Sequence, residues 1–273
     1  MATHGSAFPI AKLALNNNVP PILMASLRMG MVMLLLIPFW KFKIPDKKYL
    51  KSLILFSISM GVMVYVFMNL SLKHSSFISP IIIGAQLAVP FAVLLSAKMI
   101  GESISAKKWM YVILAFVGII IVFFDPELKN NVLGLFFASL MALFFAIAQV
   151  YSRQLKELSL IILNAYTGFF GFFVLIVVSF FVEGEVIINI KNINFESWIL
   201  ISYQAVIVSL FAHMSMFYLY KFYTVGQIFP FYSLFPIFGI ILTFLIFGEI
   251  PSLLFFIGSF FVVSSVILLQ KTK

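Results

Sequence analysis

A few polar residues interrupt long apolar stretches of this sequence, and these residues are the candidates for chemistry. A polar side chain in hydrocarbon is costly unless it has a partner or faces a wet cavity. The charge of Arg28 would either attract a substrate carboxylate or bind helix-end carbonyls. The other candidate substrate-binding residues, each with interhelical hydrogen bonding as its alternative role, are Tyr65, Asn69, Gln86, Gln149, Ser209, His213 and Tyr232.

Helical spacing places several of these residues on common faces. Gly61, Tyr65 and Asn69 recur every four residues, as do Gln86 and Pro90, and residues four apart share one face of an α-helix. The proline removes a backbone hydrogen bond and kinks its helix, which frees carbonyls for water or substrate. We therefore expect a central pocket with aromatic walls and few polar groups.

His213 is the one candidate expected to titrate near neutral pH. With a rotation of about 100° per residue, it falls on the same stripe as Ser202, Ser209 and Tyr220. It is either a site of proton exchange or a hydrogen-bonded histidine of the protein core.

The acidic residues lie away from the apolar stretches. We expect Glu102 and Glu249 to serve in turns or as helix caps. Without paired carboxylates, a metal cluster or any cysteine, the sequence predicts no enzyme, no metal and no cofactor. The nine carboxylates in loops or at helix ends are Asp46, Glu102, Asp125, Glu127, Glu157, Glu183, Glu185, Glu196 and Glu249.

Composition indicates a membrane protein. The 273 residues are 63% hydrophobic and 10% charged, against about 45–50% hydrophobic in soluble domains. The net charge of +9 comes from residues that flank apolar blocks. We therefore expect a lipid bilayer and not a nucleic acid as the partner.

The apolar blocks have the length of membrane-spanning helices rather than of barrel strands. We expect an all-α membrane protein whose first helix is truncated, because the first block is too short for a full crossing. The predicted spans are residues 1–15, 21–40, 52–72, 76–97, 109–124, 132–152, 159–182, 198–220, 228–247 and 252–270.

Lysine and arginine accumulate in alternate loops, as cytoplasmic loops do. An even number of spans with both termini in the cytoplasm accounts for this distribution. The outer side then holds Lys73, Lys129 and Lys191, and Lys12 and Arg28 lie within spans. The cytoplasmic side holds Lys41, Lys43, Lys47, Lys48, Lys51, Lys98, Lys107, Lys108, Arg153, Lys156, Lys221, Lys271 and Lys273.

Two stretches of the chain repeat each other. A shift of 147 residues superposes Gly101-Glu102 on Gly248-Glu249, each pair between two apolar spans. Two repeats of five helices enter the membrane from opposite sides, because five is odd, and such inverted repeats recur in transporters. We place the first repeat at residues 1–125 and the second at 132–270. Two prolines precede each pair: Pro80 and Pro90, then Pro230 and Pro236.

These features resemble the EamA-type branch of the drug/metabolite transporter superfamily. Residues 5–12 are similar to the opening pattern of that family, and residues 20–28 (PPILMASLR) to its second span. The two Gly-Glu turns match as well, although His4 departs from the family's opening. The resemblance implies a ten-helix permease of the inner membrane that often exports amino acids or related metabolites.

The sequence thus predicts a multi-pass permease that moves a small polar metabolite, an amino acid or derivative, by alternating access and in the direction of efflux. Kinks at Pro90 and Pro236 would accommodate the motion. A homodimer is a further possibility. The alternatives are a non-transporting membrane subunit or scaffold and, less favoured, an intramembrane enzyme acting on lipids.

Overall fold

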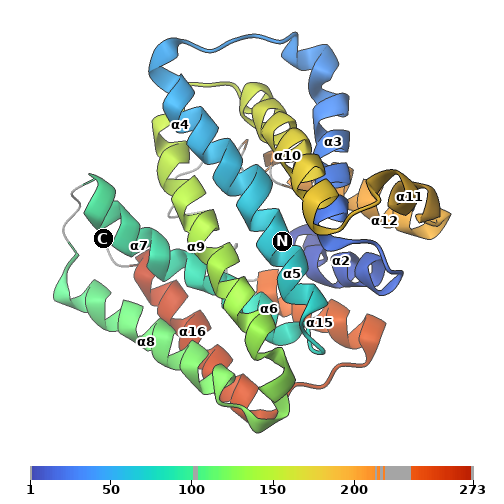
Figure 1. The fold of residues 1–273 in the computed structure, drawn as a ribbon. Coiled ribbons are helices and arrows are strands. Elements are labelled where there is room, and N and C mark those ends of the chain that lie inside the picture. Colours follow the sequence, from blue (N-terminus) through green and yellow to red (C-terminus); the bar gives the residue numbers. More distant parts are fainter. Residues whose placement is uncertain (1, 101–103, 213, 216–217, 219–234, 272–273) are drawn as a thin grey trace.

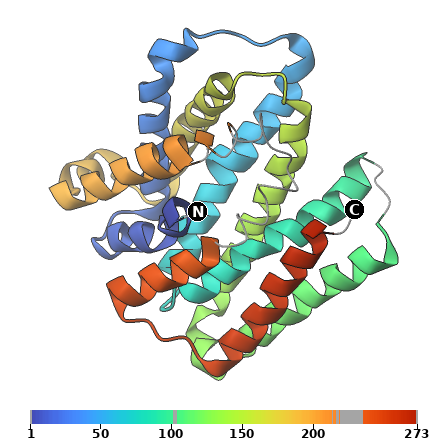
Figure 2. The same cartoon turned by 180° about the vertical axis from the view of Figure 1, so that it is seen from behind.

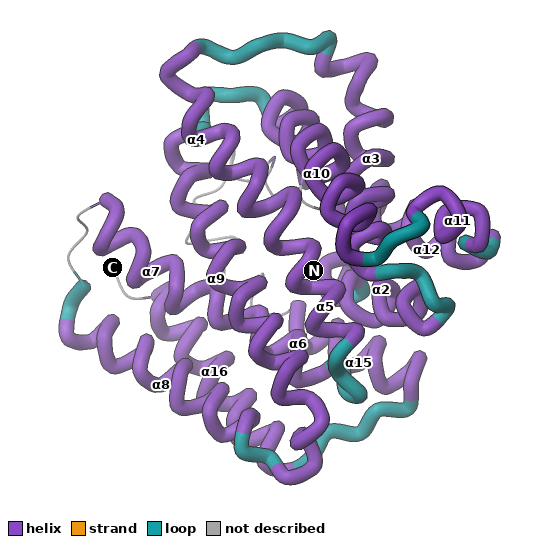
Figure 3. Tube along the Cα trace, viewed as in Figure 1, coloured by secondary structure: helices purple, strands orange, loops and turns teal. Residues whose placement is uncertain are grey.

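The chain folds into a bundle of helices, and every regular element in the described residues is a helix (Figures 1 and 3). The computed structural model describes all residues except 1, 101–103, 213, 216–217, 219–234 and 272–273. The expected all-helical membrane protein is therefore confirmed for the described part of the chain.

Eight helical stretches of the described chain are long and apolar enough to cross a membrane. They are α3 (Pro21–Trp40), α4–η1–α5 (Lys47–Ser57, Ile58–Val64, Tyr65–Lys73), α6–η2–α7 (Ser79–Gly84, Ala85–Leu87, Ala88–Ile100), α8 (Ala106–Phe123), η3–α9 (Pro126–Asn131, Val132–Gln154), α10 (Leu160–Val182), α12–η4 (Phe195–Tyr203, Gln204–Ala212) and α16 (Leu253–Lys271). The shorter helices are α1 (Ala2–Gly5), α2 (Ala7–Asn16), α11 (Val186–Asn192) and α15 (Phe235–Phe247).

The predicted spans follow these elements in order, with a few differences. The third span begins at Lys47 rather than at residue 52, because the lysines of α4 already belong to the helix. The first span is divided into α1 and α2, and the ninth is described only from Phe235. Helix α11 was not expected in the loop before α12. The layout of ten helices in two inverted repeats stays a prediction.

Three of the spans contain turns that are not α-helical. Segments η1 and η4 are π-helical, and η2 is a 3₁₀ turn. Pro90 explains η2, because it has no N–H to donate to the carbonyl of Gln86, four residues earlier. The break expected from Pro90 is therefore present. The two π-helical segments were not predicted, since an α-helical period of 3.6 was assumed throughout.

Glycines allow the closest helix contacts. Helices α8 and α16 lie side by side in both views (Figures 1 and 2). A Cβ on Gly118 would lie 2.7 Å from the carbonyl oxygen of Gly258, and one on Gly258 would lie 2.6 Å from that of Gly118. Helices α3 and α10 also lie together, where a Cβ on Gly168 would meet the backbone of Met33 at 2.9 Å. Small residues at such crossings are typical of helices packed in a bilayer.

One end of the bundle carries the loops that are rich in lysine. Ser52 Oγ donates to Gln154 Oε1 at 2.5 Å, and Lys48 Nζ lies 3.9 Å from a Glu157 carboxylate oxygen. Tyr49 also donates to Glu157, and this hydrogen bond together with the nearby Lys48 lowers the pKa of the carboxyl. These exposed contacts join the start of α4 to the α9–α10 loop.

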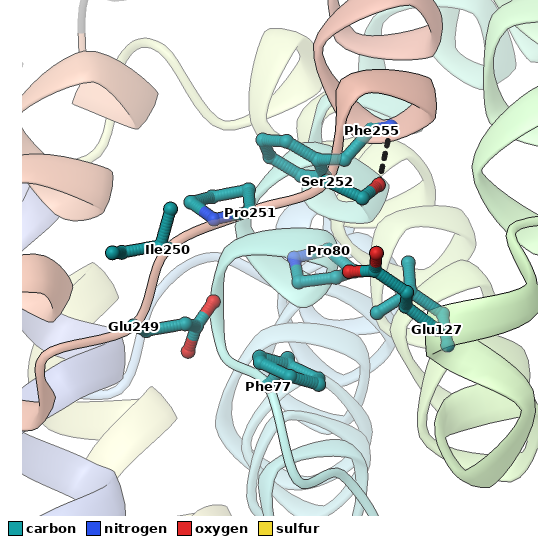
Figure 4. Close-up of a pocket in the computed structure, with 9 residues that line it drawn as sticks. Phe77, Pro80, Glu127, Glu249, Ile250, Pro251, Ser252 and Phe255 are labelled. Atoms are coloured by element: carbon teal, nitrogen blue, oxygen red, sulfur yellow. Dashed lines mark hydrogen bonds between the residues drawn. The ribbon is translucent and has the colours of Figure 1, made fainter.

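Glutamates close two helix ends at the opposite end of the bundle. Glu249 accepts hydrogen bonds from the backbone N–H groups of Ile78 and Ser79 at 2.7 and 2.8 Å, ahead of α6. Figure 4 shows its carboxylate beside Phe77 in a small pocket under the turn that precedes α16. The expectation that Glu249 is a cap is therefore confirmed, whereas Glu102 lies outside the described residues.

Glu183 performs the same role for α3. Its two carboxylate oxygens accept from the N–H groups of Ile22 and Leu23 at 2.8 and 2.9 Å, and Ser179 Oγ donates to it at 2.7 Å. At the same end, Lys12 Nζ donates to the carbonyls of Leu72 and Ser75 at 2.6 and 2.7 Å, which satisfies the end of α5.

We predict that Glu183→Gln lowers the apparent Tm of the purified protein in detergent by about 3–6 °C. The substitution removes the negative charge from the N-terminus of α3 and turns one acceptor into a donor that faces an N–H group. Glu185→Gln is the matched control, because that exposed side chain makes no hydrogen bond to any described residue. An equal loss in both variants would contradict the capping role.

Candidate functional site

Arg28 is the buried charge around which the candidate site is built. It lies in the second turn of α3, about 10 Å along the helix from Pro21, and is 4% exposed. Its Nε donates to Ser209 Oγ at 2.9 Å and its Nη1 to Gln204 Oε1 at 2.7 Å. The α3 helix is thereby tied to η4, which lies far away in the sequence.

An aromatic ring and a backbone carbonyl complete this network. Arg28 Cζ lies 4.2 Å from the ring centroid of Tyr65, a cation–π distance. The hydroxyl of Tyr65 is 3.5 Å from Ser209 Oγ. Gln204 Nε2 also donates to the carbonyl of Ala7 at 2.6 Å. The network therefore joins α2, α3, α5 and η4 through neutral partners of one cation.

The π-helical turn of η4 brings Gln204 and Ser209 to the same guanidinium. These residues are five apart, and a π-helix bonds residue i to i+5. An α-helical turn of 100° per residue would place them about 140° apart around the helix. For this reason, the α-helical period did not reveal Gln204 as a site residue. The one signal in the sequence was a polar residue within an apolar span.

An open cavity of about 80 Å³ adjoins Arg28 and Tyr65, enough for several water molecules or a ligand of comparable size. The polar residues of its lining come from α1, α3, α5, η2 and α9: His4, Arg28, Tyr65, Gln86 and Gln149. The apolar residues are Ala7, Phe8, Met60, Val64, Met68, Ala85, Ala88, Val89, Met141, Ala142, Phe145, Val208 and Phe235.

Gln86 places a buried amide at this cavity without a hydrogen-bond partner. The residue is 2% exposed, and its Nε2 has no acceptor among the described residues. It lies in the 3₁₀ turn that Pro90 imposes, so the backbone break and the polar side chain coincide. Buried polar groups are nearly always satisfied, so an unpaired amide at a cavity indicates a missing partner.

The structure brings together some of the predicted site residues and separates others. Arg28, Tyr65, Gln86 and Gln149 line the cavity. Ser209 accepts a hydrogen bond from Arg28 but is not one of the lining residues. Asn69 lies outside the lining, where its side-chain amide donates to the carbonyl of Pro21 at 2.9 Å. His213 and Tyr232 lie outside the described residues. The substrate-binding role of each residue stays a prediction.

The described lining of the cavity contains no acidic residue, and the described chain contains no group of three or more His, Cys, Asp or Glu that could hold a metal ion. The polar groups of the described lining are one cation, two amides, a tyrosine and a histidine on apolar walls, an arrangement that can bind a small ligand.

Comparison with known proteins identifies a family. The sequence model of the family described as "EamA-like transporter family" matches residues 1–124 and 132–270 of this chain. None of the curated protein sequences matches significantly.

One solved structure, whose title reads only "Crystal structure of protein", matches with a TM-score of 0.62. Its sequence is 16% identical, and the match covers 97% of this chain and 94% of that chain. At this identity the likeness concerns the fold alone.

We predict that Tyr65→Leu lowers the apparent Tm by a few degrees more than Tyr65→Phe does. Leucine removes the ring that faces the guanidinium, a contact of about 0.5–2 kcal/mol, whereas phenylalanine keeps the ring and loses only the hydroxyl. Thermal unfolding of both variants in the same detergent checks the difference. Equal losses would show that the ring does not stabilise Arg28.

Proposed function

The chain belongs to the EamA-like transporter family, and we propose that it is a secondary permease that moves a small polar metabolite across a membrane. The cargo is an amino acid or a derivative of one, and the direction is efflux. One cavity at the interface of several helices, with a buried cation and an unpaired amide, is the observation that carries the proposal.

The site draws residues from both halves of the chain. Arg28, Tyr65 and Gln86 belong to the proposed first repeat, residues 1–125, and Gln149 and Ser209 belong to the second, 132–270. Transporters with inverted repeats bind substrate near the midplane, between the repeats. A site that takes groups from both halves changes shape when one half moves, and this supports alternating access.

Irregular turns next to the cavity support the same motion. Segments η1 and η4 and the 3₁₀ turn η2 lie in the spans that carry Tyr65, Ser209 and Gln86. Such turns in membrane helices have weaker or shifted backbone hydrogen bonds and often mark functional hinges. We propose that bending at Pro90 and at Pro236, the second residue of α15, accompanies transport.

We propose further that the protein lies in the inner membrane with both termini in the cytoplasm. The lysine-rich contacts between α4 and the α9–α10 loop support a cytoplasmic assignment of that end. A role for His213 in proton coupling and a homodimeric assembly stay proposals.

Transport is tested with purified protein in liposomes and a panel of labelled amino acids and their derivatives. We predict flux above that of empty liposomes for at least one solute, and a reduction of about tenfold in Gln86→Leu, which removes the unpaired amide from the cavity. Unchanged flux is expected of Lys129→Gln, an exposed position outside the site. No flux for any solute would reject the proposed function.

The orientation is tested by cysteine accessibility, since the natural chain has no cysteine. The 27 residues of the span from Lys47 to Lys73 would cover about 40 Å as a helix. We therefore predict that a single cysteine at position 47 reacts with a membrane-impermeant thiol reagent only from the cytoplasmic side. A cysteine at 129 should react only from the outer side, and reaction of both from one side would overturn the topology.

A further inference from the structure

We infer that the cavity binds an organic carboxylate with a single negative charge, an apolar body and no free ammonium group, with the carboxylate at Arg28. This inference rests on the proposed function and narrows its cargo to acidic derivatives of amino acids whose amino group is acylated or absent.

The first step is the charge of Arg28, which no described residue neutralises. Its contacts are a serine hydroxyl, a glutamine amide oxygen and a tyrosine ring, all of them neutral. Among the described residues, no carboxylate lies within ion-pair distance of it. A buried cation is costly unless it is paired, so an anion that enters the cavity gains an interaction that the empty site lacks.

The second step is that four of the acidic residues have partners elsewhere, and no described acidic residue lines the cavity. Glu183 and Glu249 bind backbone N–H groups at helix ends, and Asp125 accepts from Ser252 in a turn. Glu157 pairs with Lys48 and Tyr49 at the lysine-rich end. The sequence from 213 to 234, which includes the largest segment outside the description, contains no Asp or Glu. No described residue supplies a counter-charge to Arg28, so an anionic ligand can supply it.

The third step excludes a ligand with a free ammonium group. Such a group would need a carboxylate or several acceptors in place of its lost water. Arg28 is the only Arg, Lys, Asp or Glu among the described lining residues. An ammonium group would consequently be repelled by the guanidinium without gaining a carboxylate from the described lining, so amines and zwitterions should bind more weakly than anions.

The fourth step concerns the rest of the ligand. Neither Gln86 Nε2 nor the side-chain amide of Gln149 makes a hydrogen bond to any described residue. They are suited to a carbonyl oxygen on the ligand. Apolar side chains dominate the remaining wall, among them Phe8, Met60, Met68, Phe145 and Phe235. A carboxylate ligand that also carries an amide carbonyl and an aromatic or aliphatic side chain can pair with Arg28, accept from the glutamine amides and pack against the apolar wall.

Four compounds with the same side chain but different charges test which charge state of the ligand the cavity prefers. They are N-acetylphenylalanine (anion), N-acetylphenylalaninamide (neutral), phenylalanine (zwitterion) and phenylalaninamide (cation). Binding to the full-length protein in lipid nanodiscs is measured by isothermal titration calorimetry at neutral pH. We expect N-acetylphenylalanine to bind with a Kd about tenfold or more below that of the other three. Equal or tighter binding of the zwitterion or the cation, or no binding of any compound at millimolar concentration, overturns the inference.

Variants assign the effect to Arg28. Arg28→Gln should weaken binding of N-acetylphenylalanine by about tenfold or more and change binding of the neutral amide by less than about twofold. Lys51→Gln, which removes an exposed cation from α4, is the matched control and should bind as the natural protein does. An unchanged Kd in Arg28→Gln overturns the inference. If this variant does not fold, the four-compound comparison in the natural protein still decides.

Flux measurements in liposomes separate this inference from the proposed function. Transport of phenylalanine or phenylalaninamide without transport of N-acetylphenylalanine would reject the anionic cargo and leave the permease intact. Tight binding of N-acetylphenylalanine without flux of any solute would support the anion site and reject the permease.

Discussion

A positive charge held inside an apolar helix bundle is the constraint on which the site depends. Arg28 can remain there only because groups from distant segments meet it: Gln204 and Ser209 from η4, and the ring of Tyr65. Each partner is neutral, so the geometry stabilises the guanidinium without cancelling its charge. The same contacts hold α3 against η4. The packing of these helices and the electrostatics of the cavity therefore depend on the same residues.

The backbone ends of the helices impose a second constraint. In hydrocarbon or near it, unsatisfied N–H and C=O groups are costly, and the first and last turns of each helix expose several of them. Glu183, Glu249 and Lys12 supply partners across the chain, from one helix to the end of another. One end of the bundle is thus fastened by partly buried bonds to backbone groups.

The polar contacts at the opposite end are of another kind. Ser52 with Gln154, and Lys48 with Glu157, make contacts that are exposed to solvent, and exposed ion pairs contribute about 0–1 kcal/mol each. Beside these contacts, a buried apolar cluster of Leu53, Phe56, Ala148, Leu155 and Leu163 packs α4, α9 and α10 together. The cavity lies among spans with π-helical or 3₁₀ turns, where the regular backbone hydrogen bonding is already interrupted.

The sequence by itself determined the class, the approximate spans and most polar residues of the cavity. The hydrophobic pattern that marks a span can be read from neighbouring residues alone. A polar residue buried in an apolar span is costly in any fold. The sequence was therefore enough to select the polar residues Arg28, Tyr65, Gln86 and Gln149. Only the tertiary structure decided which of them meet. Asn69 was grouped with Tyr65 by spacing, yet its partner is the carbonyl of Pro21. Gln204 was missed because the π-helical turn of η4 arises in the packed bundle and changes the period from which faces were inferred.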